Sequence, residues 1–238
     1  MPFTKFGLSD PLVQGILATG YTAPTEIQSK AIPAAISGKD IIGCAQTGTG
    51  KTAAFVLPIL NRLSHEPPTD VDAPERHGKS KDNKRPIRCL ILTPTRELAV
   101  QVERSIREYG RFTPLRAAAI YGGVNIKGQL TALRRGVDIV VATPGRLMDH
   151  MRQHTIDLTH VEVLVLDEAD RMLDMGFILD VRKIIGALPT HRQTMLFSAT
   201  ISPEVKALSA GIMKEPEMIQ IGVPRNPIET ITQHFYPV

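Results

Sequence analysis

Eight residues after a short apolar run have the composition of a phosphate-binding loop. The run at 41–44 is followed by Ala45-Gln46-Thr47-Gly48-Thr49-Gly50-Lys51-Thr52, where a helical pattern begins. Glycines let backbone N–H groups turn inward around phosphate oxygens, and the following helix points its positive end at them. We expect Lys51 to reach the β- and γ-phosphates of a nucleotide, and the Thr52 hydroxyl to bind Mg²⁺. Ala45 replaces the first glycine of the general pattern, and a plain glycine-rich turn is the alternative.

A second candidate site is the acidic sequence Asp167-Glu168-Ala169-Asp170, which follows the apolar residues 164–166. By itself, an acidic tetrapeptide is common at exposed helix starts. Here it would bring Asp167 to a strand end, where a metal-associated carboxylate is needed opposite Thr52. Glu168 could orient and deprotonate an attacking water. Glu168, Lys51 and Asp167 are therefore the predicted catalytic residues of a nucleoside triphosphatase.

Six short apolar runs must position these residues. Each run ends in a small or polar loop, and a helical segment follows it; the runs are residues 41–44, 88–92, 117–120, 138–141, 161–166 and 194–197. Runs that are apolar throughout and separated by helices indicate a parallel sheet covered on both faces. We therefore predict an α/β fold with a mainly parallel central sheet. Ligands bind outside the carboxyl ends of such strands, and the distinctive motifs all fall at that edge.

Composition sets looser limits on function. The chain has 238 residues and a formal net charge of +4, which is compatible with a polyanionic partner without establishing one. Cys44 and Cys89 lie far apart in apolar runs, without His or Cys at ligand spacing, so we expect reduced core residues in a cytoplasmic protein. Because no signal-peptide pattern or membrane-length apolar run occurs, we expect a soluble protein without membrane contact.

The motifs, taken in order, resemble those of the DEAD-box RNA helicases. The sequence contains AQTGTGKT, PTRELA, TPGR, the literal DEAD and SAT, and the match extends from Phe6 to the last residues. Members of that family have two RecA-like P-loop domains joined by a linker, and this chain is similar to the first. The charged insert after the phosphate-loop helix is similar to bacterial members of the RhlE type. The resemblance implies an ATP-dependent RNA helicase with ATP and Mg²⁺ as cofactors.

The resemblance also implies a domain organisation. Residues 1–217 would form an N-terminal RecA-like ATP-binding domain, in which the proline-rich and charged stretch at 65–86 would be a mobile loop. Residues 218–230 would end this domain and link it to a second RecA-like domain beginning at 231–238. We expect this chain alone to be monomeric. Without the arginine finger of the second domain, it should bind ATP but be nearly inactive in hydrolysis.

Adenine recognition is assigned by the resemblance to the region before residue 30. The stretch at 20–28 is similar to the family's Q motif, with Tyr21, Thr25 and Gln28 as its nucleotide-binding residues. A glutamine amide carries both a donor and an acceptor, so Gln28 can pair with the N6 and N7 edge of adenine. Phe6, at the family's usual distance upstream, would stack on the adenine ring. The alternatives are a helix-start glutamine and a core phenylalanine.

An RNA-binding surface is also implied by the resemblance. Its predicted residues are Pro94, Thr95, Arg96, Gly122, Gly123, Thr143, Pro144, Gly145 and Arg146. Thr95 and Thr143 would head helices whose free N–H groups bind phosphate, and Arg146 would add a charge-assisted contact. Contacts to the sugar–phosphate backbone specify little sequence, and contacts to the 2′-hydroxyl favour RNA over DNA. For Arg96, a structural salt bridge is the alternative.

Residues 198–200 would couple hydrolysis to strand separation, because the hydroxyls of Ser198 and Thr200 can hydrogen-bond Asp170. Other functions stay open at this stage. A P-loop ATPase acting on DNA or protein is disfavoured by Gln28, Phe6 and TPGR, and a purely structural role by the two assembled motifs. An ATP-gated RNA clamp is not distinguished from an unwinding enzyme, and the residues name neither the RNA nor the cellular process.

Overall fold

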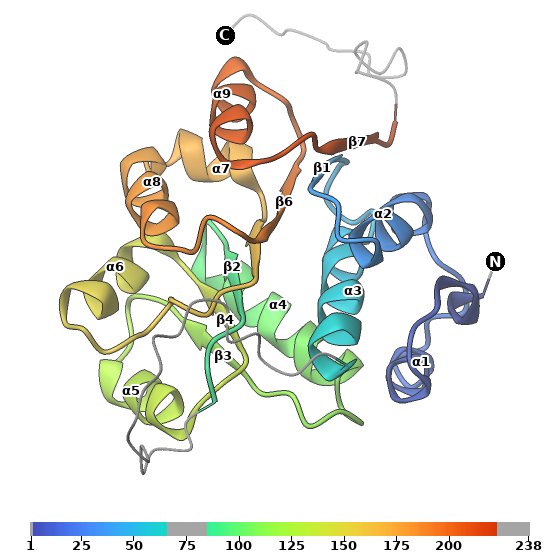
Figure 1. The fold of residues 1–238 in the computed structure, drawn as a ribbon, viewed down its shortest axis with the longest axis horizontal. Helices are drawn as coiled ribbons and strands as arrows, with labels where there is room; N and C mark the ends of the chain where they lie inside the picture. Colours follow the sequence, from blue (N-terminus) through green and yellow to red (C-terminus); the bar gives the residue numbers. More distant parts are fainter. Residues whose placement is uncertain (1, 66–84, 223–238) are drawn as a thin grey trace, which may run out of the picture.

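Within residues 2–65 and 85–222, which the computed structural model describes, the chain forms a seven-stranded sheet between two layers of helices (Figure 1). Most of the predicted mobile loop at 65–86 lies outside the described residues, as do most of the predicted linker at 218–230 and all of 231–238. The part of the chain that carries the predicted motifs is therefore covered by the structure.

The strands lie in the order β3-β4-β2-β5-β6-β1-β7, and each neighbouring pair is parallel. The α/β prediction is thus confirmed, with parallel pairing throughout the described sheet. The strands are β1 (Ile41–Cys44), β2 (Cys89–Leu92), β3 (Ala117–Ile120), β4 (Ile139–Ala142), β5 (Val163–Leu166), β6 (Gln193–Ser198) and β7 (Glu217–Gln220). The six runs read from the sequence all become strands, with ends shifted by at most two residues.

Alternate residues of each strand pack against different helices. In β2, Cys89 and Ile91 belong to the core beneath α1–α4, whereas Leu90 and Leu92 belong to the core beneath α5–α9. The helices are η1 (Phe3–Phe6), α1 (Asp10–Leu17), α2 (Glu26–Ile36), α3 (Lys51–His65), α4 (Arg96–Tyr109), α5 (Ile126–Arg135), α6 (Pro144–Arg152), α7 (Ala169–Asp174), α8 (Ile178–Gly186) and α9 (Pro203–Ile212). Burial on both faces explains why the strand sequences are apolar throughout.

A buried ion pair fixes the amino ends of the central strands β2 and β5. The Arg88 guanidinium donates from Nε to Glu162 Oε1 at 2.7 Å and from Nη2 to Oε2 at 3.1 Å. Its Nη1 donates to the carbonyl of Leu63 in α3 at 3.2 Å. Arg88 and Glu162 are both less than 10% exposed, and Arg62 Nη2 lies a further 3.9 Å from Glu162 Oε2, so the buried charges are paired. The end of α3 is therefore held at the edge of the sheet opposite the motif loops.

Gly15 lies where α1 meets the C-terminal end of α4. A Cβ atom at Gly15 would lie 2.0 Å from the carbonyl oxygen of Tyr109. The obstructing atom belongs to the backbone, so no side-chain rotation can relieve the overlap. Glycine at this position therefore allows the close approach of α1 to α4.

We predict that Gly15→Ala lowers the free energy of unfolding by about 1–3 kcal/mol, because α1 must move away from α4. Gly128→Ala is the matched control, since Gly128 lies in α5 and a Cβ there meets nothing within 4 Å. It should leave stability unchanged or raise it by up to about 1 kcal/mol. Urea unfolding of the two variants measures both effects, and equal stability would contradict the packing argument.

Candidate functional site

The loop between β1 and α3 folds back on its own backbone. Lys51 begins α3 and is 8% exposed, and its Nζ donates to the carbonyl oxygen of Ala45 at 2.6 Å. The Thr49 hydroxyl donates to the carbonyl of Gln46 at 2.8 Å. These hydrogen bonds hold residues 45–50 in a curved loop that precedes the N-terminus of α3, and the sequence predicts a loop at this position. The ammonium of Lys51 has two further hydrogens for a ligand.

The side chain of Gln28 is hydrogen-bonded to the backbone of this loop. It is fully buried in α2, its Nε2 donates to the carbonyl of Gly50 at 3.1 Å, and its Oε1 accepts from Thr25 N at 2.9 Å. Gly50 has φ +91°, and a Cβ atom there would lie 2.4 Å from Gln28 Nε2, so both conformation and space require glycine. The adenine-reading role of Gln28 stays a prediction, and it requires the amide to exchange or share these bonds.

The phosphate loop and the acidic tetrapeptide line one cavity of about 540 Å³. Only β6 separates β1 from β5 in the sheet, so the two motifs leave the same edge one strand apart. The cavity is lined by Tyr21, Thr47, Gly48, Gly50, Lys51, Thr52, Ala53, Leu98, Gln101, Arg104, Ser105, Glu108, Tyr109, Asp167 and Glu168. The structure therefore brings the predicted residues Lys51, Thr52, Asp167 and Glu168 together with part of the glycine loop, whereas Ala45, Gln46 and Thr49 do not line this cavity.

Asp167 is a carboxyl group with an unusual electrostatic setting. It is 3% exposed, and burial raises its pKa to about 7, with the Glu168 carboxylate adding to the rise and Lys51 opposing it. Its Oδ1 accepts from the backbone N–H of Glu168 at 3.0 Å. A divalent cation beside this carboxylate would offset the desolvation of its charged form. The residues thus fit Mg²⁺ shared between protein and phosphate oxygens.

The rest of a cation's ligands must come from elsewhere. Among the described residues, no group of three or more His, Cys, Asp or Glu side chains is arranged to hold a metal ion. Mg²⁺ usually keeps several waters and takes one or two protein ligands together with substrate phosphates. Thr52 and Asp167, which line the same cavity, match that minimal set.

Glu168 has a strained backbone. Its φ of 51° and ψ of 52° lie in the left-handed region, although it carries a side chain. This residue is the N-cap of α7, and its carboxylate accepts from Arg171 Nη1 at 3.2 Å. The strained conformation orients Glu168 at the cavity wall immediately after Asp167. Such strain is found preferentially at functional sites.

Asp170 is bound to the loop after β6. Its Oδ2 accepts from the Thr200 hydroxyl and backbone N at 2.9 Å each, and from Ala199 N at 3.2 Å. The Ser198 hydroxyl instead accepts from the backbone N of Asp170 at 3.3 Å. Burial alone would raise the pKa of Asp170, but the hydroxyls of Thr200 and Ser198 outweigh it and lower that pKa. Both hydroxyls therefore contact Asp170, as predicted. The Thr200 hydroxyl bonds its carboxylate, and the Ser198 hydroxyl bonds its backbone N–H.

Sequence reasoning missed the contribution of α4 to the cavity. Gln101, Arg104, Ser105 and Glu108 line it beside the phosphate loop. Their spacing of three and four residues puts them on one face of the helix, a signal that was available in the sequence. Arg104 and Glu108 form an exposed ion pair at 2.7 Å, so they frame the cavity mouth.

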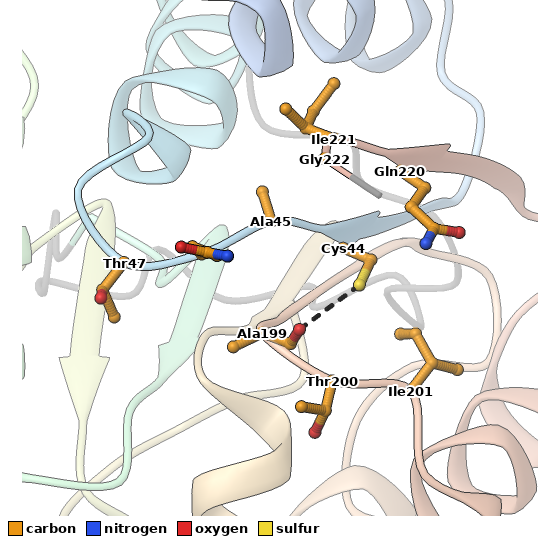
Figure 2. A pocket seen from close by; sticks show the side chains of 10 residues that line it. Cys44, Ala45, Thr47, Ala199, Thr200, Ile201, Gln220, Ile221 and Gly222 are labelled. Carbon is orange, nitrogen blue, oxygen red and sulfur yellow. Dashed lines mark hydrogen bonds between the residues drawn. The ribbon is translucent and has the colours of Figure 1, made fainter. Parts of the chain in front are cut away.

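A second cavity of about 590 Å³ lies at the start of the phosphate loop and shares Thr47 with the first (Figure 2). Its walls are residues 44–47, 199–201 and 220–222. Cys44 lines this cavity, and its Sγ donates to the carbonyl of Ala199 at 3.5 Å (Figure 2). Cys89 is buried as predicted, whereas Cys44 is half-buried and only partly a core residue, because β1 ends there. Burial raises the pKa of the Cys44 thiol despite Lys51 nearby.

The predicted adenine-binding aromatics belong to a small cluster near the N-terminus. Phe6 is half-buried in η1 and packs edge-on against Phe3, with ring centroids 6.1 Å apart. Tyr21 contacts both Phe3 and Tyr109 edge-on, at 6.2 and 6.0 Å. Tyr21 lines the phosphate cavity, whereas Phe6 is not among its lining residues. Stacking of Phe6 on adenine stays a prediction.

The predicted RNA-binding residues begin at three further strand ends. Thr95 is the N-cap of α4 and accepts from Leu98 N at 3.3 Å, and Thr143 is the N-cap of α6. Arg96 is exposed, with its guanidinium 5.2 Å from the centroid of the Tyr121 ring. Arg96 thus makes a cation–π contact, and the salt-bridge alternative has no support among the described residues.

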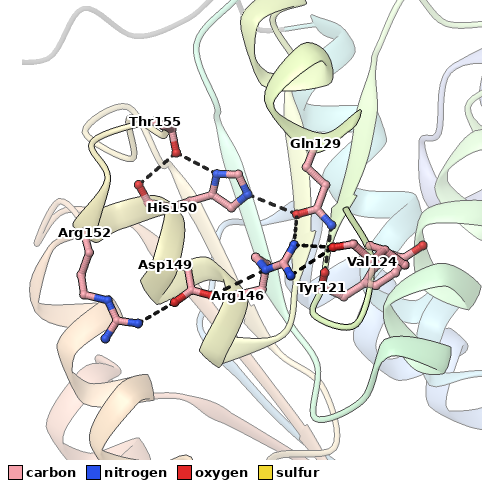
Figure 3. A network of polar contacts seen from close by, with 8 residues as sticks. All are labelled: Tyr121, Val124, Gln129, Arg146, Asp149, His150, Arg152 and Thr155. Carbon is pink, nitrogen blue, oxygen red and sulfur yellow. Dashed lines mark hydrogen bonds and ion pairs between the residues drawn. The ribbon is translucent and has the colours of Figure 1, made fainter. Parts of the chain in front are cut away.

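Arg146 makes several contacts within the protein that the sequence did not predict. Its Nη1 and Nη2 each donate to the carbonyl of Val124 at 3.2 Å, and Nη1 lies 3.4 Å from Gln129 Oε1 (Figure 3). Its Nε lies 3.6 Å from Asp149 Oδ2, and the side chain is 14% exposed. Arg146 therefore holds the turn that contains Gly122 and Gly123. Its direct RNA contact stays a prediction.

The fold and the shared cavity define a RecA-like P-loop domain. A solved structure, that of a DEAD box protein from the hyperthermophile Methanococcus jannaschii, matches with a TM-score of 0.81 and 38% identity. The match covers 92% of this chain and 56% of that one. The family model described as DEAD/DEAH box helicase matches residues 25–208, which is most of the chain. The chain belongs to the DEAD/DEAH box helicase family.

Curated relatives agree with this assignment. The chain is 42% identical to the ATP-dependent RNA helicase CshA of Limosilactobacillus reuteri, over 99% of this chain and 44% of that protein. It is 43% identical to the probable ATP-dependent RNA helicase ddx27 of Dictyostelium discoideum, over 99% of this chain and 28% of that protein. The chain thus spans less than half the length of these relatives. They come from bacteria and a eukaryote, so the RhlE-type subgroup stays a prediction.

We predict that Glu168→Gly is more stable than Glu168→Ala by about 1 kcal/mol, because only glycine removes the strain at φ 51°. Both variants lose the carboxylate and its ion pair with Arg171, so the difference between their free energies of unfolding reports the backbone strain at residue 168. Thermal and urea unfolding measure it. An alanine variant as stable as the glycine variant would show that Glu168 is not strained.

Proposed function

We propose that the whole protein is an ATP-dependent RNA helicase and that this chain is its N-terminal RecA-like domain, at residues 1–217 with its last strand reaching Gln220. The observation that supports this most is the single cavity lined by Lys51, Thr52, Asp167 and Glu168. Residues 218–230 would lead to a second RecA-like domain that begins at 231–238. The proposed location of the protein is the cytoplasm; within the described residues, no helix has the length and apolarity to cross a membrane.

In this proposal, the chain binds ATP with Mg²⁺. Backbone N–H groups of residues 46–52 would surround the phosphates, and Lys51 would donate to the β- and γ-phosphates. Thr52 and Asp167 would hold the cation, which neutralises charge on the phosphates when bound. Glu168 would accept a proton from the attacking water. Phe6, Tyr21, Thr25 and Gln28 would bind the base.

RNA would bind by its backbone at the ends of β2, β3 and β4. The residues are those predicted: Pro94, Thr95, Arg96, Gly122, Gly123, Thr143, Pro144, Gly145 and Arg146. Thr95 and Thr143 head α4 and α6, whose first N–H groups can bind phosphate, and the exposed Arg96 supplies positive charge. Asp170, held by Ser198 and Thr200, would transmit the state of the nucleotide site to the loop after β6.

Hydrolysis and unwinding would need the second domain. Charge developing on the transferred phosphate is stabilised in related reactions by an arginine finger, worth about 10³–10⁵-fold in rate. Sites of this family are shared between two RecA-like domains, so we propose that this chain alone is a monomer that binds ATP and turns it over barely or not at all.

We predict that titration of this chain with ATP and Mg²⁺ detects binding, and that Lys51→Met weakens it at least about tenfold, because charge-assisted bonds to phosphate are lost. The matched control is Lys183→Met, which changes an exposed lysine on α8, on the other face of the sheet. Bound ATP should stay largely intact, with or without RNA. Absence of binding by the unaltered chain, or equal affinities of the two variants, would refute the proposed nucleotide site.

A further inference from the structure

The turn between β3 and α5 is held at both of its ends. The carbonyl of Tyr121 accepts from Gln129 Nε2 at 2.9 Å, and the carbonyl of Val124 accepts from both terminal nitrogens of Arg146 at 3.2 Å (Figure 3). Between these two carbonyls lie the paired glycines. Because glycines allow many backbone conformations, the shape of this turn depends on the two side chains that hold its ends.

The Oε1 atom of Gln129 helps to fix the orientation of both Gln129 and Arg146. Gln129 Oε1 lies 3.4 Å from Arg146 Nη1 and 3.1 Å from His150 Nε2 (Figure 3). Gln129 is 8% exposed, so water does not easily replace these partners. The amide must present its oxygen to two donors, with its nitrogen toward Tyr121. A flipped amide would face donors with a donor and the Tyr121 carbonyl with an oxygen.

His150 is the partner that fixes this orientation. It is fully buried, and its Nδ1 lies 2.8 Å from the Thr155 hydroxyl. Burial lowers the pKa of His150, Arg146 lowers it further and Asp149 opposes this, so the ring is neutral at physiological pH. A neutral ring has one N–H group. Since Gln129 presents an oxygen, that group is Nε2–H. Nδ1 then lies 2.8 Å from the Thr155 hydroxyl as an acceptor and shares its hydrogen with the His150 carbonyl, which is 3.1 Å from the same hydroxyl.

We propose that His150 is a positioning residue for RNA binding, acting through Gln129 to hold the turn at 121–124 in its binding shape. His150 would act indirectly, because its fully buried ring does not reach RNA. The inference rests on the proposed function, because it takes the paired glycines of this turn as an RNA contact. It adds a determinant of that surface that lies four residues beyond the TPGR motif.

Three substitutions at residue 150 test the proposal. His150→Leu removes the donor to Gln129 and should weaken binding of a single-stranded RNA of mixed sequence by roughly tenfold. His150→Gln can place an N–H group where Nε2 lies and should stay within about threefold of the unaltered chain. His150→Asn can reach Thr155 but not Gln129, so it should resemble the leucine variant. Arg96→Ala is the benchmark for loss of a direct contact.

Affinity for ATP with Mg²⁺ separates positioning from general damage. It should be unchanged in all three variants, because the nucleotide cavity contains none of the residues of this network. The proposal is overturned if a folded leucine variant binds RNA like the unaltered chain, if glutamine and leucine behave alike, or if ATP and RNA affinities fall together. Should the leucine variant not fold, the asparagine variant replaces it, because it lacks the same donor to Gln129 and should weaken RNA binding by roughly tenfold as well.

Backbone chemical shifts give a readout without RNA. The amide signals of residues 122–125 should move or broaden in His150→Leu, and His150→Gln should restore their original positions. If the unaltered chain binds no RNA, the proposed RNA surface fails, while these signals still decide whether His150 holds the turn. Unchanged signals at residues 122–125 in the leucine variant would overturn the inference by themselves.

Discussion

Parallel pairing of β5, β6 and β1 is the constraint on which the site depends. Cys44 pairs with Ser198 and Leu166 pairs with Leu196, so the three strands end at one edge of the sheet. The loops that follow therefore have to share the space beyond that edge. One of them carries the glycines predicted to bind phosphate, and another carries the buried carboxylate of Asp167. Reversing one strand would move its motif to the opposite edge, where the Arg88–Glu162 pair lies.

The loops at this edge are held mainly by bonds to the backbone. Lys51 bonds the carbonyl of Ala45, Gln28 bonds that of Gly50, and Arg146 bonds that of Val124. Side chains that the sequence suggests as ligands thus also shape the loops that bind. Because buried polar groups must be paired, a ligand that engages them has to share or replace these bonds. In the proposed function, this would give nucleotide and RNA binding a physical means of moving the loops.

The fold could be predicted from the sequence because burial on both faces leaves apolar runs, and each run ends in a distinctive motif. The phosphate loop and Asp167 could be placed for the same reason, since strand ends determine where they lie. The bond between Gln28 and the Thr25 N–H closes a capping box at the start of α2 and matches the helix-start alternative. The left-handed backbone of Glu168 and the bonds of Gln28 to Gly50 and of Arg146 to Val124 could not be predicted. They depend on contacts between segments far apart in the chain. His150 gave no signal, because a lone histidine in a helix is usually an ordinary core or surface residue.

The measurement that tests the account most directly is how strongly Mg²⁺ raises the affinity for ATP, in the unaltered chain and in Thr52→Val. If Thr52, Asp167 and the phosphates hold one cation, Mg²⁺ should raise the affinity of the unaltered chain at least about tenfold and that of the variant much less. The same gain from Mg²⁺ in both folded proteins would contradict a site built on the convergence of Lys51, Thr52 and Asp167.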